Sequence, residues 1–130
     1  MIYSAAVIAR VRDPKYAGWL PRDAPDVGTG EAGTLDSGTM ARIQIRVEES
    51  TRRIDQAVFK VFGCSAAIAS ASLVTERLRG APVDRVREID ALTVVAELAL
   101  PPERASVAAL AVTAARHAVE DWERKHDRNL

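Results

Sequence analysis

A junction between a strand and a helix, at Gly63-Cys64, constrains most strongly what this chain can fold into. Upstream of Gly63 apolar and polar residues alternate, as in a half-buried strand, and downstream of Cys64 the residues are small and helix-compatible. The only cysteine of the chain therefore lies where a strand ends and a helix begins. A thiol at a helix N-terminus lies near the positive end of the helix dipole, which favours the thiolate. A single cysteine among alanines is also typical of a small buried hydrophobic residue, so both interpretations of Cys64 stay open.

Two alternating runs predict the sheet. From Met40 to Val47 the isoleucines and valine alternate with arginine and glutamine, and a second alternating run extends from Ile54 to Val61. The polar stretch between the two runs favours a hairpin, whose second strand brings Gly63-Cys64 to one end of the sheet. The segment 14–38 is rich in glycine and proline, with Trp19 and Leu20 as its expected apolar anchors. We expect a weakly protected loop there, with one short edge strand near 27–34.

Helical spacing accounts for the rest of the chain. It predicts a short helix capped by Ser4, a helix over 65–79, short helical pieces after Pro82 and around 92–98, and a long final helix after Pro101-Pro102. A helix, a loop, a short antiparallel sheet and then several helices are typical of the α+β class. We therefore predict one domain over residues 1–130, with about three antiparallel strands and the helices packed mainly on one face.

Composition excludes several classes of function. Eighteen basic and eighteen acidic residues cancel among 130, and no strongly basic tract gives a reason to expect a nucleic acid or an anionic membrane as partner. No apolar run approaches the roughly 20 residues that span a bilayer, and the N-terminus does not resemble a signal peptide. One cysteine excludes an internal disulfide and favours a reducing, cytoplasmic location.

The motifs give little support for an enzyme. Gly28-Thr29-Gly30-Glu31-Ala32-Gly33 has the spacing of a dinucleotide loop, but the strand before it and the helix after it are missing. His117 and His126 lie nine positions apart on one predicted helix, about 180° from each other, so they cannot hold one metal ion together. No histidine or lysine is placed as a base for Ser37, Ser106 or Cys64.

Several motifs, in order along almost the whole chain, resemble the IscU-type iron–sulfur cluster assembly scaffolds, the family that includes the N-terminal domain of NifU. The most specific are Phe62-Gly63-Cys64, Ala67-Ile68-Ala69-Ser70 and Ser72-Leu73-Val74-Thr75-Glu76. The others are Tyr3-Ser4, Asp13-Pro14-Lys15, Val27-Gly28-Thr29-Gly30, Ile43-Gln44-Ile45, Glu97-Leu98 and Leu100-Pro101-Pro102. The resemblance implies the same α+β fold.

The resemblance also implies where the family's cluster ligands would lie, and most of them are lost. In the family three cysteines, with an aspartate and a histidine nearby, receive sulfur and iron. The first cysteine and the aspartate correspond here to Ser37 and Thr39, and the histidine–cysteine pair corresponds to Ser106-Val107. Only Cys64 is retained, as the one candidate metal ligand and sulfur acceptor, with Asp36 as a weak additional ligand or an ordinary turn residue.

The run Leu100-Pro101-Pro102-Glu103-Arg104 resembles the family's Leu-Pro-Pro-Val-Lys, the binding sequence of a dedicated Hsp70-type chaperone. Glu103 places a negative charge where the family has an apolar residue. The resemblance therefore implies a partner-binding loop with an altered partner preference.

Two hypotheses remain. In the first, the chain is a degenerate scaffold that acts in or beside iron–sulfur cluster assembly or sulfur transfer, with a cysteine desulfurase-like partner. Its monomer holds no stable cofactor, and Cys64 carries a persulfide or shares a [2Fe–2S] cluster between the subunits of a homodimer. In the second, the chain is a non-catalytic docking or assembly subunit of a larger enzyme complex and carries no cluster.

Overall fold

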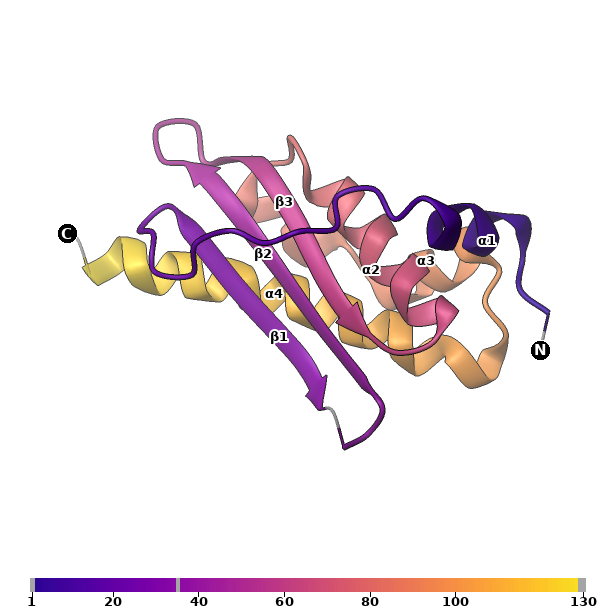
Figure 1. Cartoon of the computed structure of the whole chain (residues 1–130). Helices are drawn as coiled ribbons and strands as arrows, with labels where there is room; N and C mark the ends of the chain where they lie inside the picture. Colours follow the sequence, from indigo (N-terminus) through magenta and orange to yellow (C-terminus); the bar gives the residue numbers. More distant parts are fainter. Residues whose placement is uncertain (1, 35, 129–130) are drawn as a thin grey trace.

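Three antiparallel strands form the sheet of the computed structural model, which describes residues 2–34 and 36–128. Their order is β1 (Val27–Thr34), β2 (Thr39–Glu48) and β3 (Arg53–Phe62), as Figure 1 shows. Gly30 pairs with Ile43, Ile43 pairs with Phe59, and the register of β2 against β3 shifts between Arg46 and Val47. The predicted three-stranded sheet is confirmed, and the edge strand expected near 27–34 is β1.

The helices follow in the predicted order: α1 (Ala5–Arg12), α2 (Ser65–Leu78), the 3-10 helix η1 (Val83–Glu88), α3 (Ala91–Leu98), the 3-10 turn η2 (Pro102–Arg104) and α4 (Ala105–Arg128). The Ser4 hydroxyl caps α1 by accepting a hydrogen bond from the Val7 N–H. Helix α4 lies along β1 and β2, and α2 packs beside it on β3, so both cover the same face of the sheet (Figure 1). This arrangement confirms the α+β class.

Small side chains let α4 approach β1 very closely. A Cβ atom on Gly28 would lie 2.1 Å from the Ala118 carbonyl oxygen, and one on Gly30 would lie 1.9 Å from that of Ala114. Because both glycines are inside a buried strand, their spacing serves helix packing, in agreement with our rejection of a dinucleotide loop. Within the segment 14–38, expected to be weakly protected, residues Val27–Gly30 are buried under α4 and paired with β2.

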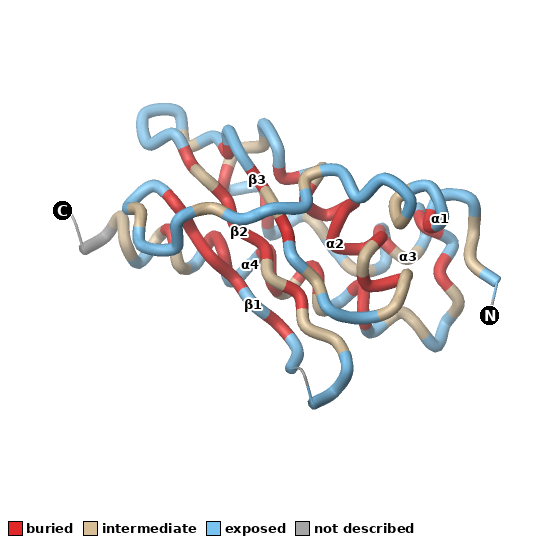
Figure 2. The backbone as a smooth tube through the Cα atoms, viewed as in Figure 1, coloured by how far each residue is buried: buried red, intermediate tan, exposed pale blue. Residues whose placement is uncertain are grey.

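The core lies between the sheet and the two long helices, where buried segments of the backbone face one another in Figure 2. Its largest fully buried side chains include Trp122, Ile43, Ile45, Ile54 and Leu78, and alanines fill much of the rest. Among the described residues, no helix is both long and apolar enough to cross a membrane.

The segment between α1 and β1 crosses the opposite face of the sheet (Figure 1). The backbone of Tyr16 and Gly18 bonds to Phe59 at the edge of β3, and the Gln44 side chain holds the Leu20 N–H and C=O, each at 2.8 Å. Gln44, expected on a polar face, is therefore buried. The expectation for Trp19 is also wrong: its side chain is 71% exposed. Neighbouring side chains of an extended segment point to opposite sides, so only one of them faces the sheet.

Candidate functional site

Cys64 lies at the N-cap of α2, as the sequence predicts. Its backbone is extended (φ −78°, ψ 174°), and its carbonyl accepts hydrogen bonds from the N–H groups of Ala67 and Ile68 at 3.0 and 3.1 Å. The side chain makes no capping hydrogen bond and is half-buried against the core. The thiol is therefore a partly accessible group at the positive end of a 14-residue helix.

The end of β3 brings Cys64 next to the start of β2. A Cβ atom on Gly63 would lie 3.3 Å from two side-chain atoms of Thr39 and 3.1 Å from the Ala67 Cβ. Glycine thus allows the β3–α2 connection to close against the first residue of β2. The structure places Thr39 against Gly63, the residue that precedes Cys64 in the chain.

Arg104, at the end of the 3-10 turn η2, is linked to Cys64 by electrostatics. The pKa of Arg104 is raised above its ordinary value, first by a hydrogen bond with the Tyr3 side chain and next by Coulomb attraction from Cys64. The Arg104 Nε atom is buried and has no hydrogen-bond partner within the described part of the chain. Arg104 is therefore a positive group within Coulomb range of the Cys64 side chain.

The sequence assigned Arg104 only to the partner-binding loop and did not predict its electrostatic link to Cys64. The sequence contained only an indirect indication that Arg104 lies at the cysteine end of the fold. The resemblance places Leu100–Arg104 just before the positions of two family ligands, so a basic residue in this run is expected at the cysteine end of the fold.

Two of the four positions of the lost ligands, Ser37 and Val107, have structural roles. The Ser37 hydroxyl donates to the Thr34 carbonyl at 2.8 Å, and the Ser37 N–H donates to the Thr34 hydroxyl at 3.1 Å, so Ser37 closes the turn between β1 and β2. Val107 is 7% exposed and belongs to the core. Ser106 and Asp36 are exposed.

These residues do not form a metal site. No group of three or more histidine, cysteine, aspartate or glutamate side chains able to hold a metal ion occurs within residues 2–34 and 36–128. A [2Fe–2S] cluster takes four ligands, normally thiolates, and this end of the molecule offers one. The donor set does not fit a cluster held by a single copy of the chain.

The histidines of α4 serve packing. His117 Nδ1 lies 3.1 Å from the Glu31 carbonyl on β1, whereas the His126 ring stacks on Trp122 with 5.1 Å between ring centroids. The two rings have different partners on different parts of the helix. This agrees with the prediction that they do not share a metal ion.

The run 100–104 is anchored at one end and exposed in the middle. Leu100 is buried at 7% exposure, and Pro102–Arg104 form one 3-10 turn in which Pro102 and Glu103 are exposed. The backbone N–H of Arg104 donates to the Pro101 carbonyl at 2.9 Å. This turn leaves the Glu103 carboxylate accessible.

Comparisons with known proteins agree with this arrangement. The model of the NifU-like N terminal domain family matches residues 2–129. The chain is 40% identical over 130 residues to the iron–sulfur cluster assembly scaffold protein IscU of Azotobacter vinelandii, covering 100% of this chain and 99% of that protein. It is 38% identical over 127 residues to IscU of Rickettsia prowazekii, covering 98% of this chain and 96% of that protein.

Solved structures share the fold. The N-terminal part of a nitrogen-fixing NifU-like protein from Brucella abortus has a TM-score of 0.59 at 18% identity, covering 98% of this chain and 95% of that one. A scaffold protein of the SUF system from Fervidobacterium islandicum, described as putative, has a TM-score of 0.62 at 14% identity, covering 90% and 96%.

The sheet, the two helices on one face and the cysteine at the β3–α2 junction define a scaffold-type carrier domain. The chain belongs to the NifU-like N-terminal domain family, which is also the family of the IscU scaffolds. The resemblance stated from the sequence is thereby confirmed. Scaffolds of this family are non-catalytic carriers, in agreement with the prediction that the chain is not an enzyme.

Proposed function

We propose that this chain acts in or beside iron–sulfur cluster assembly as a sulfur carrier, with Cys64 accepting sulfane sulfur from a cysteine desulfurase. IscU-family scaffolds work with a cysteine desulfurase and carry [2Fe–2S] clusters transiently. The observation that carries the proposal is the position of Cys64: the one thiol of the chain is half-buried at a helix N-terminus, within Coulomb range of Arg104.

The proposed step conserves atoms and electrons. The Cys64 thiolate attacks the terminal sulfur of the desulfurase persulfide, a bond forms between the two sulfurs, and the donor's S–S bond breaks. The donor cysteine leaves as a thiolate and takes up the proton, so the sulfane sulfur moves without net oxidation. Arg104 and the N-terminus of α2 would stabilise the negative charge before and after transfer.

The cluster itself is cargo that one copy of this chain is poorly equipped to hold. Two copies would contribute two Cys64 thiolates, and small thiols would have to supply the remaining ligands of a shared [2Fe–2S] cluster. A free thiol of this kind suits a reducing compartment, and we propose the cytoplasm.

Docking of a larger protein, without sulfur chemistry, is the second candidate function. The roles of Ser37 in a turn and of Val107 in the core favour it, since these positions now stabilise the fold. The exposed Pro102-Glu103 turn would then be part of the docking surface.

Persulfide formation on Cys64 tests the proposal. The chain would be incubated anaerobically with a cysteine desulfurase and cysteine, and Cys64 would be followed by mass spectrometry of the intact protein and its peptides. We expect one added sulfur on Cys64 and none after Cys64→Ala. Arg104→Ala should slow the transfer about tenfold, equivalent to about 1.4 kcal/mol, and Arg104→Lys should restore part of the rate.

Two controls separate chemistry from docking. Arg124→Ala, near the far end of α4, removes a comparable charge and should leave the rate unchanged. A small persulfide donor in place of the desulfurase should show the same loss in Arg104→Ala, because no protein has to dock. Absence of sulfur on Cys64, together with partner co-purification that survives Cys64→Ala, would support the docking function instead.

A further inference from the structure

Two basic side chains lie opposite each other on the face of the sheet that is turned away from the helices. Arg42 of β2 is the register partner of Lys60 of β3, so the two side chains project from the same face as near neighbours. Like charges directly opposite each other destabilise a sheet. Neither side chain forms an ion pair with any residue of the described ranges 2–34 and 36–128. The pair is therefore a local excess of positive charge.

The acidic residue beside Arg42 does not compensate this charge. Glu31 of β1 is the register partner of Arg42 on its other side, but the Glu31 carboxylate is paired with Arg22. The formal net charge of the whole chain is zero, so the excess belongs to this face and not to the protein in general. The charge complement of this part of the sheet is a negatively charged ligand.

Two exposed aromatic rings lie beside the two cations. Trp19, in the segment that crosses this face, is 71% exposed, and Phe62, at the end of β3, is 46% exposed. The Lys60 Nζ atom lies 5.3 Å from the centre of the Phe62 ring, and Trp19, Arg42 and Lys60 line one open depression of about 300 Å³. Aromatic side chains and arginine are enriched in the centre of protein interfaces. We call Trp19, Arg42, Lys60 and Phe62 the aromatic–basic patch.

The edge of β3 beside the patch offers main-chain groups to a peptide. The Phe59 N–H donates to the Tyr16 carbonyl at 3.1 Å, and the Phe59 carbonyl accepts from the Gly18 N–H at 3.0 Å. Because the orientation of these groups alternates along a strand, Val61 presents its N–H and C=O in the same outward direction. Within the described part of the chain no backbone group bonds to them, and Val61 also lines the depression. An extended peptide can pair there, whereas a nucleic acid backbone has no matching N–H donor.

We propose that the aromatic–basic patch binds an acidic segment of a protein partner, in which carboxylates flank an apolar or aromatic side chain. The carboxylates compensate the two cations, and the apolar side chain packs against the two exposed rings. One residue of the segment pairs with the backbone of Val61. Neither Cys64 nor Arg104 belongs to the patch, so this binding and the proposed sulfur transfer can fail independently.

Titration of the isotope-labelled full chain with a synthetic peptide, in which glutamates flank one phenylalanine, tests the proposal by NMR. The shifts should be confined to the patch, including the Trp19 indole N–H, and binding should weaken as salt is added. A peptide with lysine in place of glutamate should not bind, and alanine in place of the phenylalanine should weaken binding about tenfold. A single-stranded oligothymidylate should bind more weakly than the acidic peptide.

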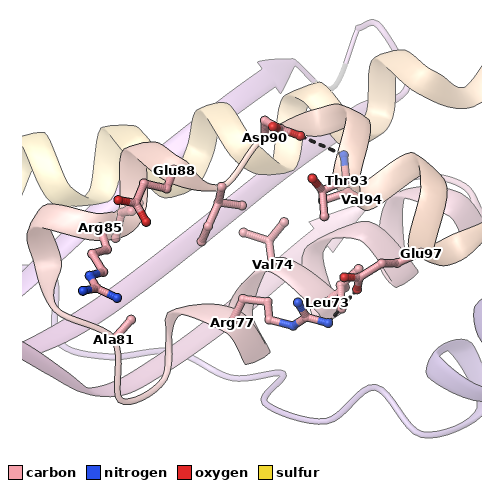
Figure 3. Close-up of a pocket in the computed structure, with 12 residues that line it drawn as sticks. Leu73, Val74, Arg77, Ala81, Arg85, Glu88, Asp90, Thr93, Val94 and Glu97 are labelled. Carbon is pink, nitrogen blue, oxygen red and sulfur yellow. Dashed lines mark hydrogen bonds and ion pairs between the residues drawn. The ribbon is translucent and has the colours of Figure 1, made fainter.

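Charge reversal tests the role of the two cations. Arg42→Glu and Lys60→Glu should each weaken binding of the acidic peptide at least about tenfold. Each variant is expected to fold, because it places opposite charges across the β2–β3 pair. The matched control is Arg85→Glu, which should leave binding unchanged. Arg85 is exposed on the helical side of the molecule, where it lines a separate cavity between α2, η1 and α3 (Figure 3).

Aromatic truncation completes the test. Trp19→Ala should weaken binding of the acidic peptide about tenfold. Leu92→Ala is its control, because Leu92 is 80% exposed on α3, outside the patch, and should bind the peptide as the parent does. An acidic peptide that fails to bind, an equal loss of binding in Arg85→Glu, or a preference for the oligothymidylate would overturn the proposal.

Discussion

Gly30→Ala is the sharpest test of the packing that positions the site. The added Cβ would lie 1.9 Å from the Ala114 carbonyl oxygen and 2.3 Å from the Ala118 backbone N, whereas real Cβ atoms essentially never come within 3.0 Å of such atoms. Relief requires α4 and β1 to separate by about 1.1 Å, because backbone atoms cannot rotate away as a side chain does. Overpacking in ordinary cores costs about 1–3 kcal/mol, and we expect Gly30→Ala to cost at least about 3 kcal/mol.

Two other glycines provide controls for this prediction. Gly18 has room for a Cβ, with Val58 Cγ1 at 3.7 Å, so Gly18→Ala should change the free energy of unfolding by less than about 0.5 kcal/mol. Gly38 has open space but a φ of +84°, so Gly38→Ala should cost about 1–2 kcal/mol. Urea unfolding followed by circular dichroism measures all three. A Gly30→Ala variant within about 1 kcal/mol of the parent would refute the close approach of α4 to β1.

Three further predictions concern the core, the crossing segment and α3. Ala71 is fully buried in α2, so Ala71→Leu should cost about 1–3 kcal/mol in a thermal melt, and an unchanged melting temperature would count against this packing. Gln44→Leu should leave the Leu20 N–H and C=O without partners, which costs about 2–3 kcal/mol and should speed hydrogen exchange over 18–26; unchanged exchange would contradict this. Hydrogen bonds from the Thr93 backbone and hydroxyl hold the pKa of Asp90 below its ordinary value. The stabilising effect of the Asp90 carboxylate is therefore present above about pH 4 and is lost as the pH falls through the lowered pKa. Asp90→Asn should remove this acid dependence of the free energy of unfolding, which urea titrations from about pH 6 to about pH 2 measure.

The sequence predicted the elements whose signals are local. Alternation revealed β2 and β3 because one face of each is buried, and helical spacing with caps revealed α1, α2 and α4. Strand β1 carried a weak signal because glycine lacks a side chain to alternate. Glycine is needed at positions 28 and 30 because α4 packs directly against their backbone. The contacting residues of α4 lie about 90 positions further along the chain, and no local sequence pattern predicts such a contact.

The candidate site was predictable only in part, for the same reason. Cys64 could be placed at a strand-to-helix junction because both flanking patterns are local. The closeness of Gly63 to Thr39, and the electrostatic link between Cys64 and Arg104, depend on how distant segments of the chain pack. The outward position of Trp19 also depends on tertiary structure, since the backbone bonds of its neighbours decide which side chain faces the sheet.

One measurement tests most directly whether Cys64 is a sulfur acceptor in a chain that cannot hold a cluster alone. The protein would be incubated anaerobically with iron, sulfide, cysteine and a cysteine desulfurase, then separated by size, with iron, sulfide and thiol mass determined in each fraction. We predict a monomer fraction free of iron, with one added sulfur on Cys64 that is absent after Cys64→Ala. A monomer that carries two irons and two sulfides and retains them after Cys64→Ala would contradict this account.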